Sequence, residues 1–281
     1  MPEMPEVEAV RRVLEPQLRG RRVASVAIAQ PQIVAHPGPD GFASAVEGRE
    51  IVGMGRRGKF LTMALGDGGT IVLHLRMTGH LLVLPANFPV QKHTHLVMGL
   101  SDGMEVRYVD PRRFGRFWYL APGEEDAVTG MAKLGPEPLD AAFTGSYLKE
   151  KAGSRSKAVK EALHDQSVVA GIGNIYSDEI LFKARIRPDT RCKDLSARLW
   201  NRLAREARAV IESSVAVNAM TPEEYREGMG EVFHNMEHVE VYGRAGEPCL
   251  RCGSTVRRME IGGRGSYYCL RCQRKRPPAR P

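Results

Sequence analysis

The chain has 281 residues and a formal net charge of +8, from 41 Lys and Arg against 33 Asp and Glu. A chain of this length usually forms two domains, at about 100–200 residues each. Excess positive charge is typical of proteins that bind a polyanion, most simply nucleic acid. No apolar run approaches the roughly 20 residues of a membrane span, and the acidic, proline-containing N-terminus does not resemble a signal peptide. We therefore expect a soluble cytoplasmic protein.

The first eight residues, Met1–Glu8, predict the start of a helix. Pro5 suits the first helical turn, where its missing N–H costs nothing. Apolar residues then recur every three or four positions, at Val7, Val10, Leu14 and Leu18. Removal of Met1 exposes the secondary amine of Pro2, and a terminal amine with a pKa near ~8 is more often neutral at pH 7 than a lysine. The spacing alone favours an ordinary capped helix, and a nucleophilic amine is the alternative.

Residues 22–120 contain short apolar or alternating segments that predict β-strands. The segments are Ile51–Arg57, Phe60–Leu65, Thr70–Leu75, Leu81–Leu84, Leu96–Leu100 and Glu105–Val109. Glycine-rich turns such as residues 66–69 separate them, which is typical of a sandwich or barrel. Residues 121–140 are rich in Pro, Gly and acidic residues and predict a linker.

From about residue 145 the apolar pattern becomes helical. The predicted helices are Lys157–His164, Asn174–Ala184, Leu195–Val217 and a capped one that starts after Thr221. We divide the chain into a β-sandwich domain (1–133), a linker (134–148), a helical domain (149–238), a zinc finger (239–276) and a disordered tail (277–281).

Four of the five cysteines form two C-x-x-C pairs, in Cys249–Cys252 and Cys269–Cys272. Four thiolates at this spacing suit tetrahedral zinc, and a closed four-sulfur shell is structural rather than catalytic. Disulfides or a redox pair are the alternatives, but so short a segment buries too little apolar surface to fold alone. Cys192 stands apart and is expected to be an ordinary buried or half-buried thiol.

Basic residues gather in Val256–Tyr268, between the two cysteine pairs, where Arg264 lies beside three glycines. An arginine at the tip of a ribbon suits phosphate or a DNA groove, and solvated charge is the alternative. Gly171–Asn174 precedes a helix and offers backbone N–H groups to a phosphate, although an asparagine cap explains it equally. Arg56–Lys59 lies between two strands and predicts either anion contact or surface charge.

Two further segments combine apolar and cationic residues on turns. Met77 follows Arg76, and Asp110–Gly115 places Phe114 beside two arginines. Exposed apolar side chains beside arginine are used to unstack a duplex, whereas in isolation such residues more often belong to a core. His93 and His95 are one residue apart, but no cysteine or carboxylate lies beside them. We therefore expect hydrogen bonding from this pair rather than metal binding.

Taken in order, these motifs resemble formamidopyrimidine-DNA glycosylase (Fpg, also MutM) over essentially the whole chain. The matching motifs are Pro2-Glu3, Pro5–Glu8, Arg57–Lys59, Met77, Asp110–Gly115, Gly171–Tyr176, Val241–Arg244 and the four cysteines. The resemblance implies an α+β fold, with an N-terminal helix and β-sandwich, a helix–two-turn–helix domain and a zinc-ribbon finger. It also implies one structural Zn²⁺, double-stranded DNA with damaged bases or abasic sites as the partner, and action as a monomer in the bacterial nucleoid.

The resemblance implies a bifunctional glycosylase and AP lyase that excises oxidised or ring-opened purines and cleaves the strand by β,δ-elimination. Pro2 matches the nucleophile, which forms an iminium with C1′ of the damaged nucleotide. Glu3 matches the family's acid/base at the sugar oxygen. Lys59 matches the lysine that transfers protons and contacts phosphate, and Arg264 matches the zinc-finger arginine that acts in the second elimination.

Residues for DNA binding follow from the same resemblance. The expected backbone contacts are His93, Arg112, Arg155, Lys160 and Asn174. The expected wedge, which fills the gap left by an everted base, consists of Met77, Arg112 and Phe114. Met4 is similar to the apolar residue usual in the purine-specific branch, and the related endonuclease VIII group generally has glycine there.

One segment departs from the family pattern. The stretch Ala219–His238 is slightly shorter than the usual loop that closes over 8-oxoguanine, and Glu231 stands where a lysine is common. Two alternatives to an 8-oxoguanine-excising enzyme therefore remain, which are a scaffold that binds damaged DNA without excising this base and a pyrimidine-specific relative. A zinc-ribbon RNA-binding protein would explain the tail but not the N-terminus.

Overall fold

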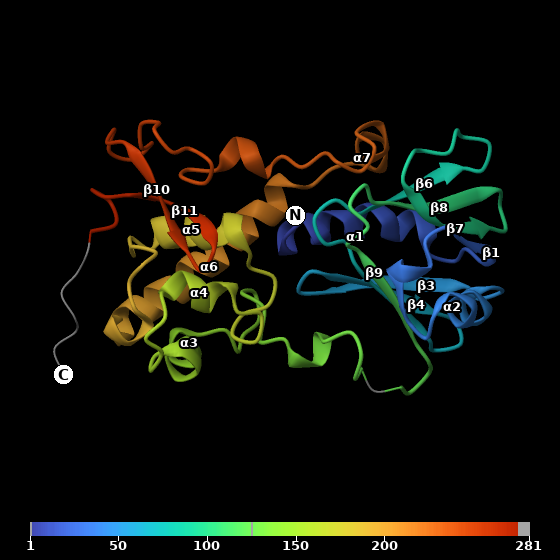
Figure 1. Ribbon diagram of the computed structural model, residues 1–281, viewed down its shortest axis with the longest axis horizontal. Helices are drawn as coiled ribbons and strands as arrows, with labels where there is room; N and C mark the ends of the chain where they lie inside the picture. The colour runs from blue at the N-terminus through green and yellow to red at the C-terminus, as the bar shows by residue number, and fades with distance from the viewer. Residues whose placement is uncertain (1, 125, 275–281) are drawn as a thin grey trace. The chain divides into compact units, whose positions relative to one another are not determined.

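The computed structural model describes residues 2–124 and 126–274, and its chain trace forms two compact units (Figure 1). The first unit comprises Met1–Ala132 with Asn218–Phe233, and the second comprises Lys133–Val217 with His234–Pro281. The sequence had placed residues 218–233 in the helical domain, whereas they group with the first unit. The predicted tail, 277–281, lies outside the described residues.

Two mainly antiparallel sheets form the first unit, and the predicted β-sandwich is confirmed. One sheet has the order β1 (Val23–Ile28), β7 (Thr94–Leu100), β8 (Met104–Val109) and β6 (His80–Pro85). The other has the order β2 (Val34–His36), β9 (Arg116–Leu120), β5 (Thr70–His74), β4 (Phe60–Leu65) and β3 (Ile51–Arg57). Alternate side chains of both sheets share a single apolar core.

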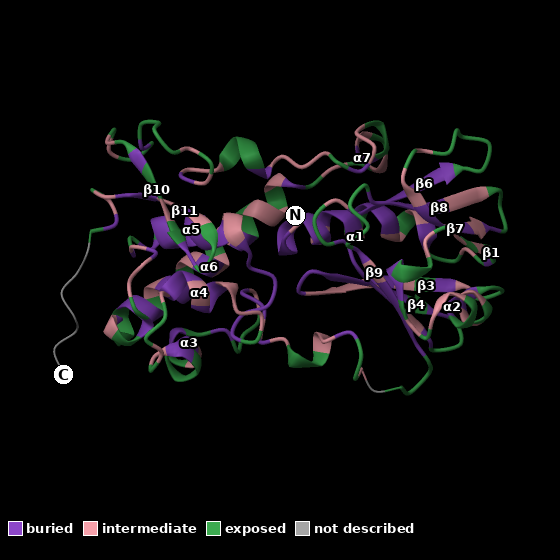
Figure 2. Cartoon of the chain, viewed as in Figure 1, coloured by how far each residue is buried: buried purple, intermediate pink, exposed green. Residues whose placement is uncertain are grey.

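Helix α1 (Met4–Leu18) contributes its predicted stripe to that core, and Figure 2 colours much of this helix as buried. It packs against β3, β4 and β6 and against α7 (Pro222–Glu227). Thr221 caps α7 as predicted, by accepting a hydrogen bond from the backbone N–H of Glu224 at 3.1 Å. Tyr225 of α7 is buried in the core of the first unit, which explains why its segment groups there.

Helix α2 (Pro39–Val46) interrupts the region in which only strands were expected. It buries just Phe42 and Val46, and two apolar positions in eight residues give little periodicity to detect. Its Phe42 ring packs edge-on against Phe117, at 6.0 Å between ring centroids.

The second unit is helical and ends in a two-stranded ribbon. Its helices are α3 (Gly145–Ala152), α4 (Val159–His164), α5 (Asn174–Lys183) and α6 (Ala197–Val217), and its strands are β10 (Val256–Ile261) and β11 (Arg264–Cys269). Helix α3 begins inside the range expected to be a linker, capped by the Thr144 side chain. Cys192 is fully buried, and burial raises the pKa of its thiol to about 11. None of the helices in the described ranges combines the length and apolarity of a membrane span.

Candidate active site and zinc centre

Pro2 lies two residues before Met4, where α1 begins, at the positive end of the helix dipole. Glu3 is the N-cap residue and is almost completely buried. The Glu6 carboxylate accepts a hydrogen bond from the backbone N–H of Glu3 at 2.7 Å and a longer one from the Asn218 side chain at 3.4 Å. This reciprocal capping box fixes the backbone that leads to Pro2.

Lys59 lies in the turn between β3 and β4 and is largely buried. A charged chain joins this hairpin to α1, because Arg56 donates to the Glu8 carboxylate at 3.1 Å and to the carbonyl of Gly58 at 3.1 Å. Glu8 also accepts hydrogen bonds from Arg11 and Arg12. Burial opposes ionisation of Glu8, but these guanidinium groups outweigh it and lower its pKa to about 2.

Met77, Arg112 and Phe114, which the resemblance implies as a wedge, come together at the surface of the first unit. The Arg112 guanidinium lies 3.0 Å from the Met77 sulfur and 4.6 Å from the centre of the Phe114 ring. Met77 is 45% exposed and Phe114 is 46% exposed, so neither is a core residue. Two loops that are distant in sequence therefore present one apolar and cationic tip.

The two neighbouring histidines take different positions. His95 is buried, and its Nε2 atom lies 2.9 Å from the Asp110 carbonyl oxygen. His93 is half-buried and has a φ of 68°. The expected hydrogen-bonding role therefore describes His95, and the ring of His93 lies 6.3 Å from that of His95, measured between centroids.

The loop before α5 is held by a glutamine side chain of the second unit. Gln166 braces it, by accepting from the backbone N–H of Gly171 at 2.9 Å and donating to the carbonyl of Ile172 at 2.8 Å. Asn174 begins the helix, so the first N–H groups of α5 point towards this loop. Arg155 is half-exposed and pairs with Asp165 at 2.8 Å.

Lys160 does not have the exposure expected of a DNA-backbone contact. It is 1% exposed, and its Nζ lies 2.8 Å from Asp178 and 3.0 Å from the carbonyl of Gly265. Asp178 also accepts from the backbone N–H of Tyr267 at 2.9 Å. The buried pair thus fastens β11 to helices α4 and α5, and the ammonium is enclosed by protein groups in this structure.

Arg264 is exposed at the start of β11, directly after the Gly262-Gly263 turn. Both glycines have positive φ values, 56° and 72°, which side chains rarely adopt. The Arg264 side chain donates to the carbonyl of Gly262 at 3.1 Å. The ribbon therefore presents this arginine at its tip, as the sequence predicted.

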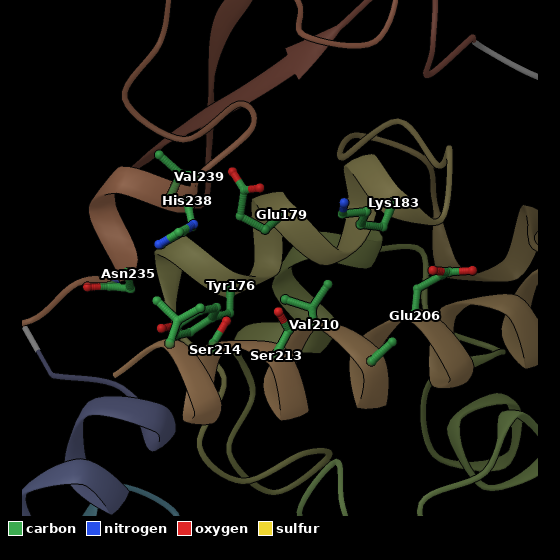
Figure 3. Close-up of a pocket in the computed structure, with 12 residues that line it drawn as sticks. Tyr176, Glu179, Lys183, Glu206, Val210, Ser213, Ser214, Asn235, His238 and Val239 are labelled. Atoms are coloured by element: carbon green, nitrogen blue, oxygen red, sulfur yellow. The ribbon is translucent and has the colours of Figure 1, made fainter. Parts of the chain in front are cut away.

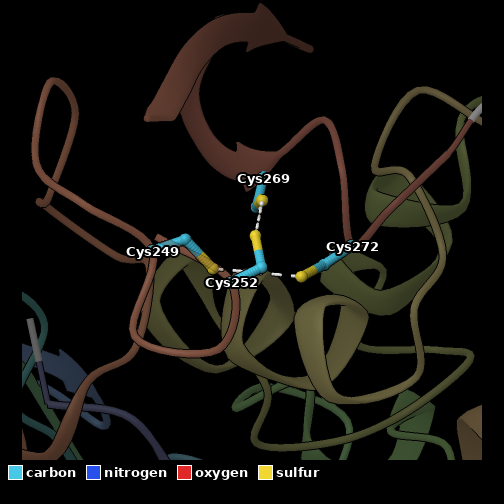
Figure 4. Close-up of side chains that lie close together, drawn as sticks. All are labelled: Cys249, Cys252, Cys269 and Cys272. Atoms are coloured by element: carbon cyan, nitrogen blue, oxygen red, sulfur yellow. Dashed lines mark hydrogen bonds between the residues drawn. The ribbon is translucent and has the colours of Figure 1, made fainter. Parts of the chain in front are cut away.

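The four paired cysteines converge below the ribbon (Figure 4). Their sulfur atoms all lie within 4.8 Å of one another, with Cys252 and Cys269 at 3.6 Å and Cys249 and Cys272 at 3.9 Å. Four thiolates at about 2.3 Å from a tetrahedral zinc ion are roughly 3.8 Å apart, so the set fits zinc closely. These cysteines hold one structural zinc ion.

Three family models match consecutive parts of the chain. The formamidopyrimidine-DNA glycosylase N-terminal domain matches residues 1–117, the H2TH domain of the same enzymes matches residues 134–225, and a zinc finger found in FPG and IleRS matches residues 246–274. The chain belongs to the formamidopyrimidine-DNA glycosylase (Fpg, MutM) family.

Curated relatives and solved structures of the Fpg family match nearly the full length. The formamidopyrimidine-DNA glycosylase of Moorella thermoacetica is 42% identical over 92% of this chain and 94% of its own. That of Bacillus subtilis is 40% identical over 98% of this chain and 100% of its own. Lactococcus lactis Fpg in complex with N7-benzyl-Fapy-dG DNA superposes with a TM-score of 0.90 at 32% identity, covering 98% and 100% of the two chains.

Some residues support the Fpg site without acting in it, and the sequence indicates these supporting residues less clearly than the residues expected to act. Glu6 stands three residues after the N-cap Glu3, which is the spacing of a capping box and is visible in the sequence. The link from Glu8 to Arg56 joins positions 48 residues apart, and no local pattern reports it. Asp110 begins the Asp110–Gly115 motif, but nothing in that motif indicates a role for its carboxylate.

A pocket of about 290 Å³ lies in the second unit and contains none of the predicted site residues (Figure 3). Its walls come from α5, α6 and the segment 235–239. Glu179 in this wall accepts hydrogen bonds from three consecutive backbone N–H groups, those of Glu240, Val241 and Tyr242, at 2.8–2.9 Å. Its carboxylate therefore anchors the segment that leads to the zinc finger.

Proposed function

We propose that this member of the Fpg family is a bifunctional DNA glycosylase and AP lyase that removes oxidised or ring-opened purines from duplex DNA. The observation that carries the proposal is Pro2 at the start of α1, next to the capped and buried Glu3. Neighbouring structures of MutM proteins contain DNA with carbocyclic 8-oxo-G or with an abasic site, which supports damaged duplex as the substrate.

The first chemical step uses the amine that Pro2 gains when Met1 is removed. The helix dipole disfavours a further positive charge at this position, which favours the neutral amine. Its lone pair attacks C1′ while the bond from C1′ to the base breaks, and the base leaves with a proton. Glu3 donates a proton to the ring oxygen of the sugar, the C1′–O4′ bond opens, and a cationic iminium joins the sugar to Pro2.

The iminium then serves as an electron sink for strand cleavage. Loss of a proton from C2′ sends electrons into the iminium and expels the 3′ phosphate, and a second elimination expels the 5′ phosphate. Lys59 transfers protons and contacts phosphate, and the hydrogen bonds of Arg56 support this because they join the Lys59 hairpin to α1. Arg264, at the tip of the ribbon, holds phosphate during the second elimination.

Binding of the duplex uses groups in both units. His93, Arg112, Arg155 and Asn174 contact the backbone, and Met77, Arg112 and Phe114 fill the space of the everted nucleotide. The exposure of Met77 and Phe114 and their contacts with Arg112 support the wedge. The protein acts as a monomer, and its net charge of +8 favours association with chromosomal DNA.

The segment after α7 bears on the choice of lesion. Gly230, with a φ of 80°, packs against His80 of β6, and Glu231 follows it. Glu231 offers a carboxylate where the family commonly has a cation, and a carboxylate cannot pair with the electron-rich oxygen of 8-oxoguanine. We therefore expect ring-opened purines and abasic sites to be cleaved faster than 8-oxoguanine.

A nicking assay on a panel of duplexes tests this function. The duplexes carry a ring-opened purine, 8-oxoguanine, an oxidised pyrimidine or an abasic site, and rates are measured with enzyme in excess. We expect excision of the ring-opened purine and β,δ-cleavage at the abasic site. Tight binding to all four duplexes with no base release would instead identify a non-catalytic reader, and preference for the pyrimidine would place the chain with the endonuclease VIII type.

A further inference from the structure

Asp110 lies beneath the wedge and is completely buried. Its carboxylate accepts hydrogen bonds from the Thr78 hydroxyl at 2.5 Å and the Tyr108 hydroxyl at 2.9 Å. It also accepts from the backbone N–H groups of Gly115 at 2.9 Å and Arg112 at 3.2 Å. Burial opposes its ionisation, but these donors outweigh burial and hold the pKa of Asp110 below its usual range.

The donors come from both loops that form the wedge. Thr78 directly follows Met77 on the first loop, while Arg112 and Gly115 enclose Phe114 on the second. Thr78 and Asp110 are 32 positions apart, so their hydrogen bond joins two turns that the chain does not connect locally. One carboxylate therefore sets the separation of the two loops.

Each loop also holds a non-glycine residue in the left-handed region, with φ values of 57° at Arg76 and 58° at Arg113. Such conformations persist where surrounding contacts over-determine the backbone. The loops approach the Tyr108 hydroxyl closely, because a Cβ atom added at Gly79 would lie 2.3 Å from it and one added at Gly115 would lie 1.7 Å from it. Asp110 orients that hydroxyl, so it fixes the contact on which both loops rest.

We propose that Asp110 is a positioning residue for base eversion, which locks the Met77 loop and the Arg112–Phe114 loop into one rigid wedge. This rests on the wedge function proposed above and deepens it. Met77 and Phe114 fill the space of an everted nucleotide only while their loops keep a fixed separation. Loosening the Asp110 hydrogen bonds should therefore impair eversion while leaving the chemistry at Pro2 intact.

Two substitutions test the proposal at different strengths. Thr78→Val removes the cross-loop hydrogen bond and keeps the shape of the side chain. Asp110→Asn weakens all the hydrogen bonds that the Asp110 carboxylate accepts. Thr78→Ser restores a hydroxyl and should recover the wild-type behaviour. Thr129→Val is the matched control, because Thr129 also donates its hydroxyl to a carboxylate, that of Asp126, away from the wedge.

The assay compares two single-turnover rates, excision of a ring-opened purine and cleavage of a preformed abasic site, which has no base to evert. Loss of a hydrogen bond to a charged group predicts an excision rate about tenfold lower for Thr78→Val. We expect cleavage of the abasic site to change by less than about twofold. Thr78→Ser and Thr129→Val should match the wild type in both rates.

A second measurement reports insertion of the wedge into DNA that the enzyme does not cleave. A duplex carries a tetrahydrofuran site with 2-aminopurine opposite, whose fluorescence rises when the wedge unstacks it, measured at saturating protein. The wild type should give a clear rise, and Thr78→Val and Asp110→Asn a smaller one.

Equal loss of excision and abasic cleavage in Thr78→Val would overturn the proposal, as would unchanged rates with an unchanged fluorescence rise. A wild type that forms no covalent intermediate and releases no base would refute the proposed function instead, and the fluorescence comparison would still decide the role of Asp110. If Asp110→Asn fails to fold, Thr78→Val still decides the question.

Discussion

Lys160 gives the sharpest quantitative prediction, because the resemblance assigns it to DNA while the structure buries it. Lys160→Met removes the cation 2.8 Å from Asp178 and keeps the apolar stem. Asp178 is 0% exposed, and of its two donors, the Lys160 ammonium and the Tyr267 backbone N–H, only the second would remain. Breaking a buried ion pair in this way costs about 3–5 kcal/mol. For a unit of this size, that corresponds to a fall in Tm of roughly 10–20 °C.

The pH dependence of this loss has a definite sign. Burial raises the pKa of Asp178 from 3.8 to about 7 against the lowering effect of Lys160, and removing Lys160 raises it further. A carboxyl whose folded pKa lies above its unfolded pKa costs increasing stability as the pH rises between the two values. Lys160→Met should therefore be less destabilised at pH 5 than at pH 8. Adding Asp178→Leu should recover much of the loss, because no unpaired charge then remains.

Thermal unfolding and the salt dependence of DNA binding together separate the two roles. A buried anchor predicts a large fall in Tm and, below the unfolding temperature, an unchanged slope of log K against log salt. A phosphate contact predicts an almost unchanged Tm and a slope smaller by about one. Arg155→Met is the comparison, because its half-exposed pair with Asp165 should contribute no more than about 1 kcal/mol. A small change in Tm with a reduced slope for Lys160→Met would refute our reasoning.

Two further predictions concern the other anchors. The pKa of Glu8 is lowered to about 2, so its ion pairs stabilise the first unit fully above the unfolded pKa of 4.5 and lose that effect as the pH falls towards 2. The difference in Tm between the wild type and Glu8→Gln should therefore narrow as the pH falls over this range. A constant difference in Tm would contradict the ion-pair account. Removing zinc with a chelator should unfold the ribbon and weaken DNA binding, while the β-sheet circular dichroism signal of the first unit persists. Loss of that β-sheet signal would show that the first unit depends on the zinc finger.

Features set by local patterns were predictable from the sequence. The stripe Val7, Val10, Leu14 and Leu18 defined α1, and all four side chains are buried. The bounds of β3 and β4 agree with the predicted Ile51–Arg57 and Phe60–Leu65, because glycine-rich turns and apolar alternation mark both ends. The zinc site followed from cysteine spacing, since a tetrahedral thiolate shell demands that pairing.

Features set by contacts between distant positions were not predictable in this way. Lys160 looks like any cation on a short helix, and only the fold brings Asp178 and Gly265 to it. The segment around Tyr225 follows the long helix in sequence but packs into the core of the first unit. Asp110 likewise gains its position from Thr78, and a motif match gives no hint of that partner.

The central claim is that the amine of Pro2 attacks the damaged nucleotide, and covalent trapping tests it most directly. The protein is incubated with duplex containing a ring-opened purine, reduced with borohydride, digested and mapped by mass spectrometry. We predict an enzyme–DNA adduct on the N-terminal peptide at Pro2, with Met1 absent, and none in a Pro2→Gly variant matched for DNA binding. An adduct located on Lys59, or equal trapping by the Pro2→Gly variant, would contradict the account.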